Sequence, residues 1–259
     1  MIRQEFRRWA PVFLGTLSFV AILLLWESAV RLGWVNPFFT SQPTAIAAAL
    51  GQEARSGELL HNLLVSLREF AEGLAAAVFV GLLLGVLAAR YRIVEYVLDP
   101  FVWFVYSSPL IAFYPLFVIW FGLGSRTVVA ITFLLAVTPI LVNTLSGIKN
   151  VSPGLLNAAR SFGANHRDLL WKVALPASVP MVVAGLRLGV GRALTGVVIA
   201  ELFGSTAGLG FSIAYYGGLL KTTNMLASLA VVVALGVLCT QGLSAVEAHF
   251  DSWRTGPGL

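Results

Sequence analysis

The sequence is poor in charged residues and nearly without cysteine. Only 11% of its 259 residues are charged, about half the share that is usual in soluble domains. The single cysteine, Cys239, cannot form an intrachain disulfide, and its apolar surroundings predict a small core residue. No GxxxxGK[ST] phosphate-binding loop is present, so we expect that the chain does not hydrolyse ATP itself.

Patterns of catalytic and metal-binding residues are missing as well. The three histidines, His61, His166 and His249, fall in three different segments, and no group of His, Cys and carboxylate residues has the spacing of metal ligands. No Gly-x-Ser-x-Gly nucleophile motif occurs. We therefore predict no catalytic residue, no metal and no cofactor bound by this chain, and an intramembrane enzyme finds no support.

Long apolar runs are what the sequence has in abundance. Hydrophobic residues make up 58% of the chain, in runs near or above the 18–20 residues that cross a bilayer as a helix. A β-barrel would alternate apolar and polar positions instead. We predict an all-α polytopic membrane protein, with a single transmembrane domain over residues 1–259 and six transmembrane helices at about 10–30, 71–89, 101–122, 127–145, 179–202 and 224–247.

The Lys and Arg residues indicate the orientation of these spans. With the N-terminus inside, ten basic residues fall on the inside, and five fall on the outside, at Arg31, Arg55, Arg68, Arg126 and Lys221. Basic residues concentrate in cytoplasmic loops, so we predict that both termini are inside. The basic N-terminus lacks a signal-peptide cleavage site, which favours a retained first helix.

Residues 58–70 form a second pattern outside the predicted spans. Six apolar side chains from Leu59 to Phe70 share one face of a helix, and polar residues such as Asn62 and Glu69 fall mostly on the other. We expect an amphipathic helix that lies at the membrane interface and leads into the second span.

A polar, strongly patterned segment at 149–176 separates the fourth and fifth spans. Ser152 and Pro153 resemble an N-cap followed by proline in the first helical turn. Gly163 permits a bend, and Pro176 is expected to end a second short helix. The pattern predicts two short cytoplasmic helices with an apolar ridge and a basic rim, a shape that fits a partner's groove.

This segment resembles the cytoplasmic loop of ABC-importer permeases, whose pattern is E-A-A-x3-G-x9-I-x-L-P. Six residues fall in register without a gap: Ala158, Ala159, Gly163, Val173, Leu175 and Pro176. Asn157 departs from the glutamate usual in the family and removes a charge there. The resemblance extends through "LDPFVWFVYSSPLIAFYPLFVIWFGLGSRT" and "LPASVPMVVAGLRLGVGRALTGVVIAELFGSTAGLGFSI" to the nitrate/sulfonate/taurine branch, which also includes carriers of thiamine precursors, riboflavin and aromatic acids.

The resemblance implies a fold, partners and a mechanism. The fold is the type I (MetI-like) ABC-importer permease fold, in the bacterial cytoplasmic membrane. Two permease copies, expected to be a homodimer, form the pathway. Two separate ATPase subunits bind ATP and magnesium below them, and a periplasmic or lipid-anchored binding protein delivers the substrate. Residues 149–176 would be the coupling loop that seats in the ATPase; no nucleic acid is expected as a partner.

Candidate pathway residues come from the third and fifth spans and from the segment that follows the fifth. Ser107, Ser108 and Tyr114 lie in a proline-containing span, which favours either a kinked pore-lining helix or a packing kink. Arg192 and Glu201 are charges within a span and are expected to face the bundle interior, although Arg192 could also snorkel from a position near the inner end. Glu201 lies near the outer end, where it could cap the following loop.

The segment at 204–224 is predicted to be a short re-entrant helix at the outer mouth. Its aromatic residues Phe211 and Tyr215 are candidates for a gate, and an interfacial aromatic belt is the alternative. The preferred function is the transmembrane subunit of an ABC importer for a small organic or inorganic solute. A self-sufficient secondary transporter or channel is the alternative.

Overall fold

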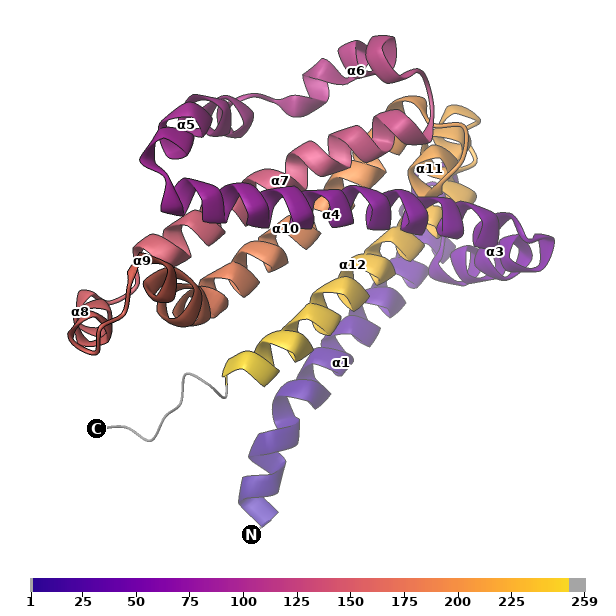
Figure 1. Cartoon of the computed structure of the whole chain (residues 1–259). Helices are drawn as coiled ribbons and strands as arrows, with labels where there is room; N and C mark the ends of the chain where they lie inside the picture. The colour runs from indigo at the N-terminus through magenta and orange to yellow at the C-terminus, as the bar shows by residue number, and fades with distance from the viewer. Residues whose placement is uncertain (1, 252–259) are drawn as a thin grey trace.

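The computed structural model describes the backbone of residues 2–251 and the side chains of residues 13–242. This part of the chain is all-helical. The elements run in the order α1 (Ile2–Arg31), α2 (Pro37–Thr40), α3 (Pro43–Ser56), α4 (Glu58–Arg90), α5 (Arg92–Ser107), the 3-10 turn η1 (Leu110–Phe113), α6 (Tyr114–Phe121), α7 (Ser125–Lys149), α8 (Pro153–Ser161), α9 (His166–Asp168), the π-helix η2 (Leu169–Ala174), α10 (Leu175–Gly204), α11 (Leu209–Gly218) and α12 (Thr222–Asp251). Figure 1 shows their arrangement.

The prediction of an all-α polytopic membrane protein is confirmed. Within the described residues, five helices are long and apolar enough to cross a membrane, and the bent pair α5–α6 brings the number to six if it is one span. The third predicted span differs in form, because α5 and the run from Leu110 to Phe121 meet at an angle of 95°. Pro109 lies at that break and cannot donate a backbone hydrogen bond.

The core is a tight layer of three helices in which α7 packs along both α4 and α10. Three glycines of α4 face α7, and none of these positions has room for a side chain. A Cβ added to Gly85 would lie 2.7 Å from the Cβ of Thr144, and one added to Gly81 would lie 2.9 Å from a methyl carbon of Ile140. Gly189 of α10 contacts Ile140 from the other side. Small residues therefore set the close approach of these helices.

Residues 58–70 do not form the separate interfacial helix that was expected. They are the first part of α4, which continues without a break for 33 residues. Asn62 and Glu69 of the predicted polar face are buried in the bundle, whereas Leu60 and Leu64 are exposed. In a membrane protein the leucines can face lipid while polar groups find partners inside, so the expected interfacial position of Asn62 and Glu69 was wrong.

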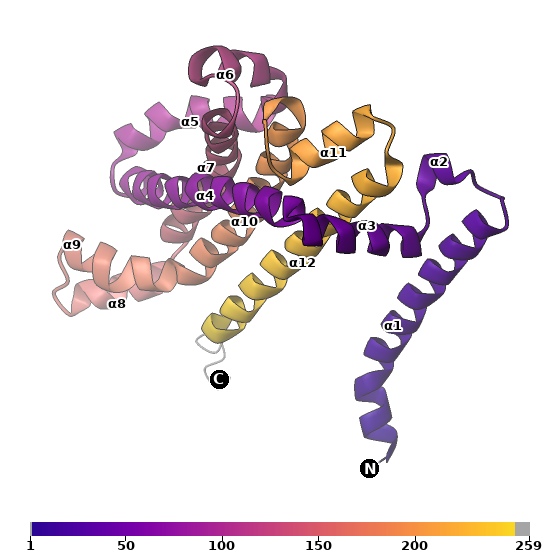
Figure 2. The same cartoon turned by 90° about the vertical axis from the view of Figure 1, so that its right-hand side faces the viewer.

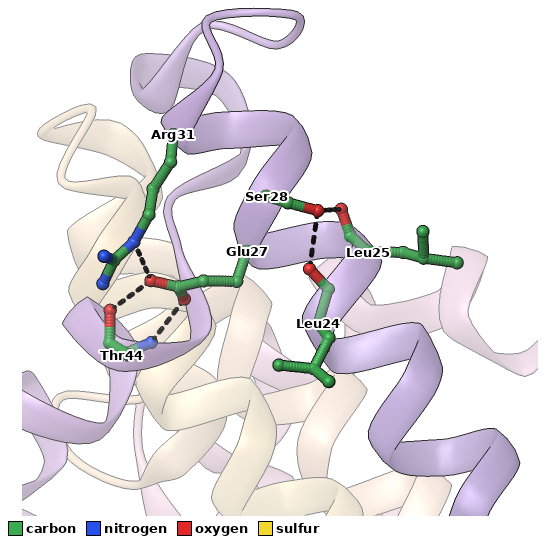
Figure 3. Close-up of polar contacts among 6 residues, drawn as sticks. All are labelled: Leu24, Leu25, Glu27, Ser28, Arg31 and Thr44. Atoms are coloured by element: carbon green, nitrogen blue, oxygen red, sulfur yellow. Dashed lines mark hydrogen bonds and ion pairs between the residues drawn. The ribbon is translucent and has the colours of Figure 1, made fainter.

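The first helix stands apart from the rest of the bundle in Figure 2, and it packs chiefly on α3. Figure 3 shows the polar contact between them. Glu27 accepts hydrogen bonds from the backbone N–H of Thr44 (3.1 Å) and from its hydroxyl (2.7 Å), and it pairs with Arg31 (2.7 Å). Gln42, the residue before α3, makes no capping bond of its own. A carboxylate from α1 therefore caps the first turn of α3.

The chain alternates between two ends of the bundle. One end gathers α2, α3 and α11 with the end of α10 and the beginnings of α4, α7 and α12. The other carries α8 and α9 and the ends of α4 and α7. The basic residues expected inside at Arg90, Arg92, Lys149, Arg160, Arg167 and Lys172 all lie at the α8–α9 end. Arg254, also expected inside, lies outside the described residues.

We expect Gly85→Ala to destabilise the bundle by about 1–3 kcal/mol, because the added methyl group has no space against Thr144. Thermal unfolding of the purified chain in detergent measures the effect as a lower Tm. The control is Gly51→Ala in α3, where no heavy atom lies within 4 Å of the added carbon. An equal Tm for the two variants would refute close packing of α4 against α7.

Candidate functional site

The segment at 149–176 forms a bent pair of short helices. Ser152 precedes α8 and Pro153 lies in its first turn, although the Ser152 side chain makes no capping bond. The chain then turns at Gly163, whose φ of +83° is a left-handed conformation that favours glycine. The predicted bend is therefore present at Gly163. Asn165 begins α9 with a capping box in which its side chain accepts the N–H of Asp168 at 2.9 Å.

The second helix does not end before Pro176, as the sequence had suggested. Instead α9 continues through the π-helix η2 directly into α10, so that helical backbone runs from His166 to Gly204. In the wider π register Leu175 donates its N–H to the carbonyl of Leu170. Pro176 follows in the first turn of α10, where its missing N–H breaks no α-helical hydrogen bond. The second half of the segment is thus joined to α10 without a break in the helical backbone.

One side of the segment packs on the bundle and the other side is open. Leu156 and Leu175 cover a small cluster made of Ile148, Val151 and Ala174. The open side carries exposed Ala158, Arg160, Arg167, Trp171 and Pro176, and Phe162 is 93% exposed at the tip of the bend. Ala159 is half-buried. This side of the segment thus presents exposed aromatic and basic side chains at its surface.

Asn157, the residue that departs from the family pattern, has a local partner. Its Oδ1 accepts a hydrogen bond from Arg160 Nη1 at 2.9 Å, and its carbonyl accepts the hydroxyl of Ser161 at 3.1 Å. Both contacts lie within α8 and are exposed. The amide therefore orients Arg160 on the open side of the segment.

A cavity of about 310 Å³ lies where the α5–α6 break faces α7 and α10. Its walls are largely apolar, and its polar lining comes from Tyr106 and Ser108 at the break, Thr138 of α7 and Arg192 of α10. The structure thus brings two of the candidate pathway residues, Ser108 and Arg192, together. A second cavity of about 370 Å³ shares Tyr106 with it and extends toward Glu95, which pairs with Lys149.

Arg192 does not lie near the inner end of its helix, as had been expected. Because α10 starts at Leu175, Arg192 is 17 residues from that start and 12 residues from Gly204, or about 26 Å and 18 Å along the axis. Arg192 therefore lies in the interior of α10, away from both of its ends.

The other candidate pathway residues lie elsewhere. Ser107 is exposed at the end of α5 and does not line the cavity. Tyr114 is buried in the core with Phe117 and Val128, and its ring centroid lies 5.9 Å from that of Phe203. Phe211 and Tyr215 stack on each other along α11, with ring centroids 5.7 Å apart.

Glu201 holds the beginning of α11. Its Oε2 accepts the N–H of Gly210 (2.6 Å) and its Oε1 accepts the hydroxyl of Ser66 (2.6 Å). Ser66 Oγ in turn accepts the N–H of Leu209 (2.8 Å), and Asn62 Oδ1 accepts that of Gly208 (2.9 Å). Three successive N–H groups at this helix N-terminus are therefore satisfied by buried side chains of α4 and α10. We name these side chains, Asn62, Ser66 and Glu201, the α11 clasp.

Further hydrogen bonds tie α11 and α12 to the helices before them. Tyr216 donates its hydroxyl to Glu58 (2.9 Å), and burial together with this carboxylate raises the pKa of the Tyr216 phenol. Asn224 donates to Glu53 (2.7 Å), and burial raises the pKa of the Glu53 carboxyl despite that bond. These contacts fix α11 and the beginning of α12 at the end of the bundle opposite α8 and α9 (Figure 2).

Comparison with known proteins assigns the family. Residues 81–252 match the family described as "Binding-protein-dependent transport system inner membrane component". The chain is 31% identical over 257 residues to the taurine transport system permease protein TauC of Escherichia coli (strain K12), which covers 97% of this chain and 93% of that protein. The chain belongs to this family of ABC transporter permeases.

Two further comparisons agree with that assignment. The putative aliphatic sulfonates transport permease protein SsuC of Bacillus subtilis (strain 168) is 30% identical over 93% of this chain and 87% of its own. A crystal structure of an amino acid ABC transporter with histidines has a TM-score of 0.63 at 16% identity, covering 78% of this chain and 97% of that one. The latter shows that this permease shares the ABC-importer permease fold.

Sequence reasoning missed two residues of the α11 clasp in this permease. Asn62 was assigned to the solvent side of an interfacial helix, and Ser66 was not singled out. The signal was present: Asn62, Ser66 and Glu69 follow one another at spacings of four and three residues in an apolar helix. Polar residues with that spacing share one helix face, and within a membrane that face turns inward.

We expect Glu201→Ala to loosen the start of α11, because Gly210 N–H and the Ser66 hydroxyl would lose their buried acceptor. Each buried donor left without a partner reduces the free energy of unfolding by about 1–3 kcal/mol. Hydrogen exchange measured by mass spectrometry should become faster in peptides covering residues 206–214. The matched control is Glu72→Ala, which removes an exposed carboxylate of α4. Unchanged exchange at 206–214 in Glu201→Ala would contradict the clasp.

Proposed function

We propose that this permease is the transmembrane subunit of an ATP-driven importer of small organosulfonates such as taurine or short alkanesulfonates. Two copies form the pathway as a homodimer in the bacterial cytoplasmic membrane, and a binding protein delivers the substrate. Two separate ATPase subunits bind ATP and magnesium and dock on residues 149–176. The permease itself binds no cofactor and catalyses no reaction.

The exposed bent helix pair at 149–176 is the observation that carries the coupling role. Phe162 and Trp171 are exposed aromatic residues beside Arg160 and Arg167, which together suit a partner groove with apolar and acidic lining. An exposed aromatic at such a tip is the kind of side chain that anchors protein interfaces. Pro176 and Leu175 then join this surface to α10.

The continuous helix from His166 to Gly204 supplies the physical link between ATPase and pathway. It is 39 residues long, or roughly 55 Å. A displacement of the coupling segment by the ATPase reaches Arg192 at the cavity and Glu201 at the α11 clasp through one rigid element. A closing ATPase dimer would thereby rock the α4–α7–α10 layer of each copy and alternate access to the cavity.

The substrate class rests on the relatives and on the cavity. The two relatives are described as transporting taurine and aliphatic sulfonates. The cavity has the size of a small-molecule site, and it combines apolar walls with one cationic side chain, Arg192. This lining suits a short apolar body with an anionic head.

The test uses the complex reconstituted in proteoliposomes with its ATPase and binding protein. Wild type should accumulate radiolabelled taurine or ethanesulfonate only when ATP is supplied to the ATPase side. Gly163→Val should abolish most of the substrate-stimulated ATP hydrolysis and uptake, because a β-branched residue is strained at a φ of +83° and would displace the tip of the coupling segment.

Gly163→Asn is the matched control, since asparagine tolerates the left-handed conformation and no heavy atom lies within 4 Å of the added carbon. It should retain coupling close to that of wild type. Full substrate-stimulated hydrolysis in a folded Gly163→Val complex would contradict the coupling role. Uptake by the permease alone, driven by an ion gradient, would contradict the ABC-importer assignment.

A further inference from the structure

The cavity at the α5–α6 break contains hydrogen-bond donors that nothing in the described structure uses. The Ser108 hydroxyl and the Arg192 guanidinium line the cavity and make no hydrogen bond or ion pair within the described residues. The Thr138 hydroxyl donates only at 3.4 Å, to the carbonyl of Leu134 in its own helix. The donors of the cavity are therefore available to a ligand.

The charge that lines the cavity is positive only. Arg192 is its only charged lining residue, and the remaining walls come mainly from leucine, valine and proline. The carboxylates nearby, Glu95 and Asp99, line the adjoining cavity instead. A ligand with an anionic head finds a counter-charge here, whereas a cationic group finds none.

Arg192 lies deep within α10, where a charged side chain without a role would be energetically unfavourable. It lies about 18 Å from the Gly204 end of α10, inside a candidate membrane span, where an unpaired charge is energetically unfavourable. It has no carboxylate partner among the described residues that would offset that cost. Its planar fork of five donors matches the oxygens of a sulfonate or similar oxyanion.

We propose that this cavity is a substrate subsite within the membrane, in which Arg192 and Ser108 bind the oxyanion head of a small organic anion and the apolar walls hold its body. The proposal rests on the proposed import function and names the site on the permease that recognises the substrate after the binding protein releases it. Arg192 recognises the charge, and Ser108 supplies a second donor from the backbone break. Because the break ends α5 at Ser107, it places Ser108 at the cavity wall.

Position 192 also couples recognition to ATP-driven movement. Arg192 belongs to the same unbroken helix as α9, the second half of the coupling segment. Displacement of that helix would move the guanidinium relative to Ser108, which belongs to the α5–α6 break. The oxyanion would be bound by both groups when they face each other and released when they separate.

The experiment measures equilibrium binding of radiolabelled ethanesulfonate to the detergent-purified permease–ATPase complex without the binding protein. Wild type should bind it saturably, and ethyl methyl sulfone, a neutral molecule of similar size, should not compete. Arg192→Gln should weaken binding at least tenfold, Arg192→Lys should restore part of it, and Ser108→Ala should weaken it several-fold. ATP-driven uptake by the complete system should fall in parallel.

Arg187→Gln is the matched control, because it removes the same charge from the same helix at a position that does not line the cavity. It should bind ethanesulfonate as wild type does. Wild-type affinity in Arg192→Gln and Ser108→Ala, or no saturable binding by wild type, would overturn the subsite. If wild type still imports ethanesulfonate with ATP in either case, the proposed function stands without the subsite; if it imports no organosulfonate, the proposed function itself fails.

Discussion

The close packing of α10 against α7 is the contact on which the rest of the permease depends. Gly185, Gly189 and Gly196 let α10 approach α7 so closely that added side chains would meet Asn143, Ile140 and Thr132. Because α4 approaches α7 in the same way, the three helices form one stiff layer. Coupling segment, cavity and α11 clasp are all attached to this layer through α10, so none of them can move far without the others.

Polar groups are arranged in this permease as the membrane requires. Asn62 and Ser66 turn inward to the N-terminus of α11, while Leu60 and Leu64 of the same helix are exposed. Irregular backbone occurs next to polar side chains or a cavity. The α11 clasp binds the N-terminus of α11, and the α5–α6 break borders the cavity lined by Ser108 and Arg192. Both arrangements follow from the cost of unsatisfied backbone groups in lipid.

The sequence predicted the helical class, the family and the bend at Gly163, because hydropathy and glycine chemistry are local signals. It misjudged features that depend on tertiary contacts. Pro176 was expected to end a helix, since no local pattern indicates that a π-turn will absorb its missing N–H. The polar face of residues 58–70 was assigned to solvent because its partner, the start of α11, lies more than 130 residues away. Ser108 and Arg192 were each noticed, but only the fold shows that they share a cavity.

The most direct test of the account is whether the coupling segment and α10 move as one body. Spin labels at Arg167→Cys and Gly191→Cys, in a chain with Cys239 replaced, lie about 36 Å apart along the helix, a distance suited to pulsed electron resonance. In complexes diluted with unlabelled copies, this distance should be the same in nucleotide-free and ATP-trapped states. In separate complexes that carry only the Arg167→Cys label, on both copies, the distance between the copies should change. A change in the distance between positions 167 and 191 within one copy would show a hinge at the π-helix and would contradict the account.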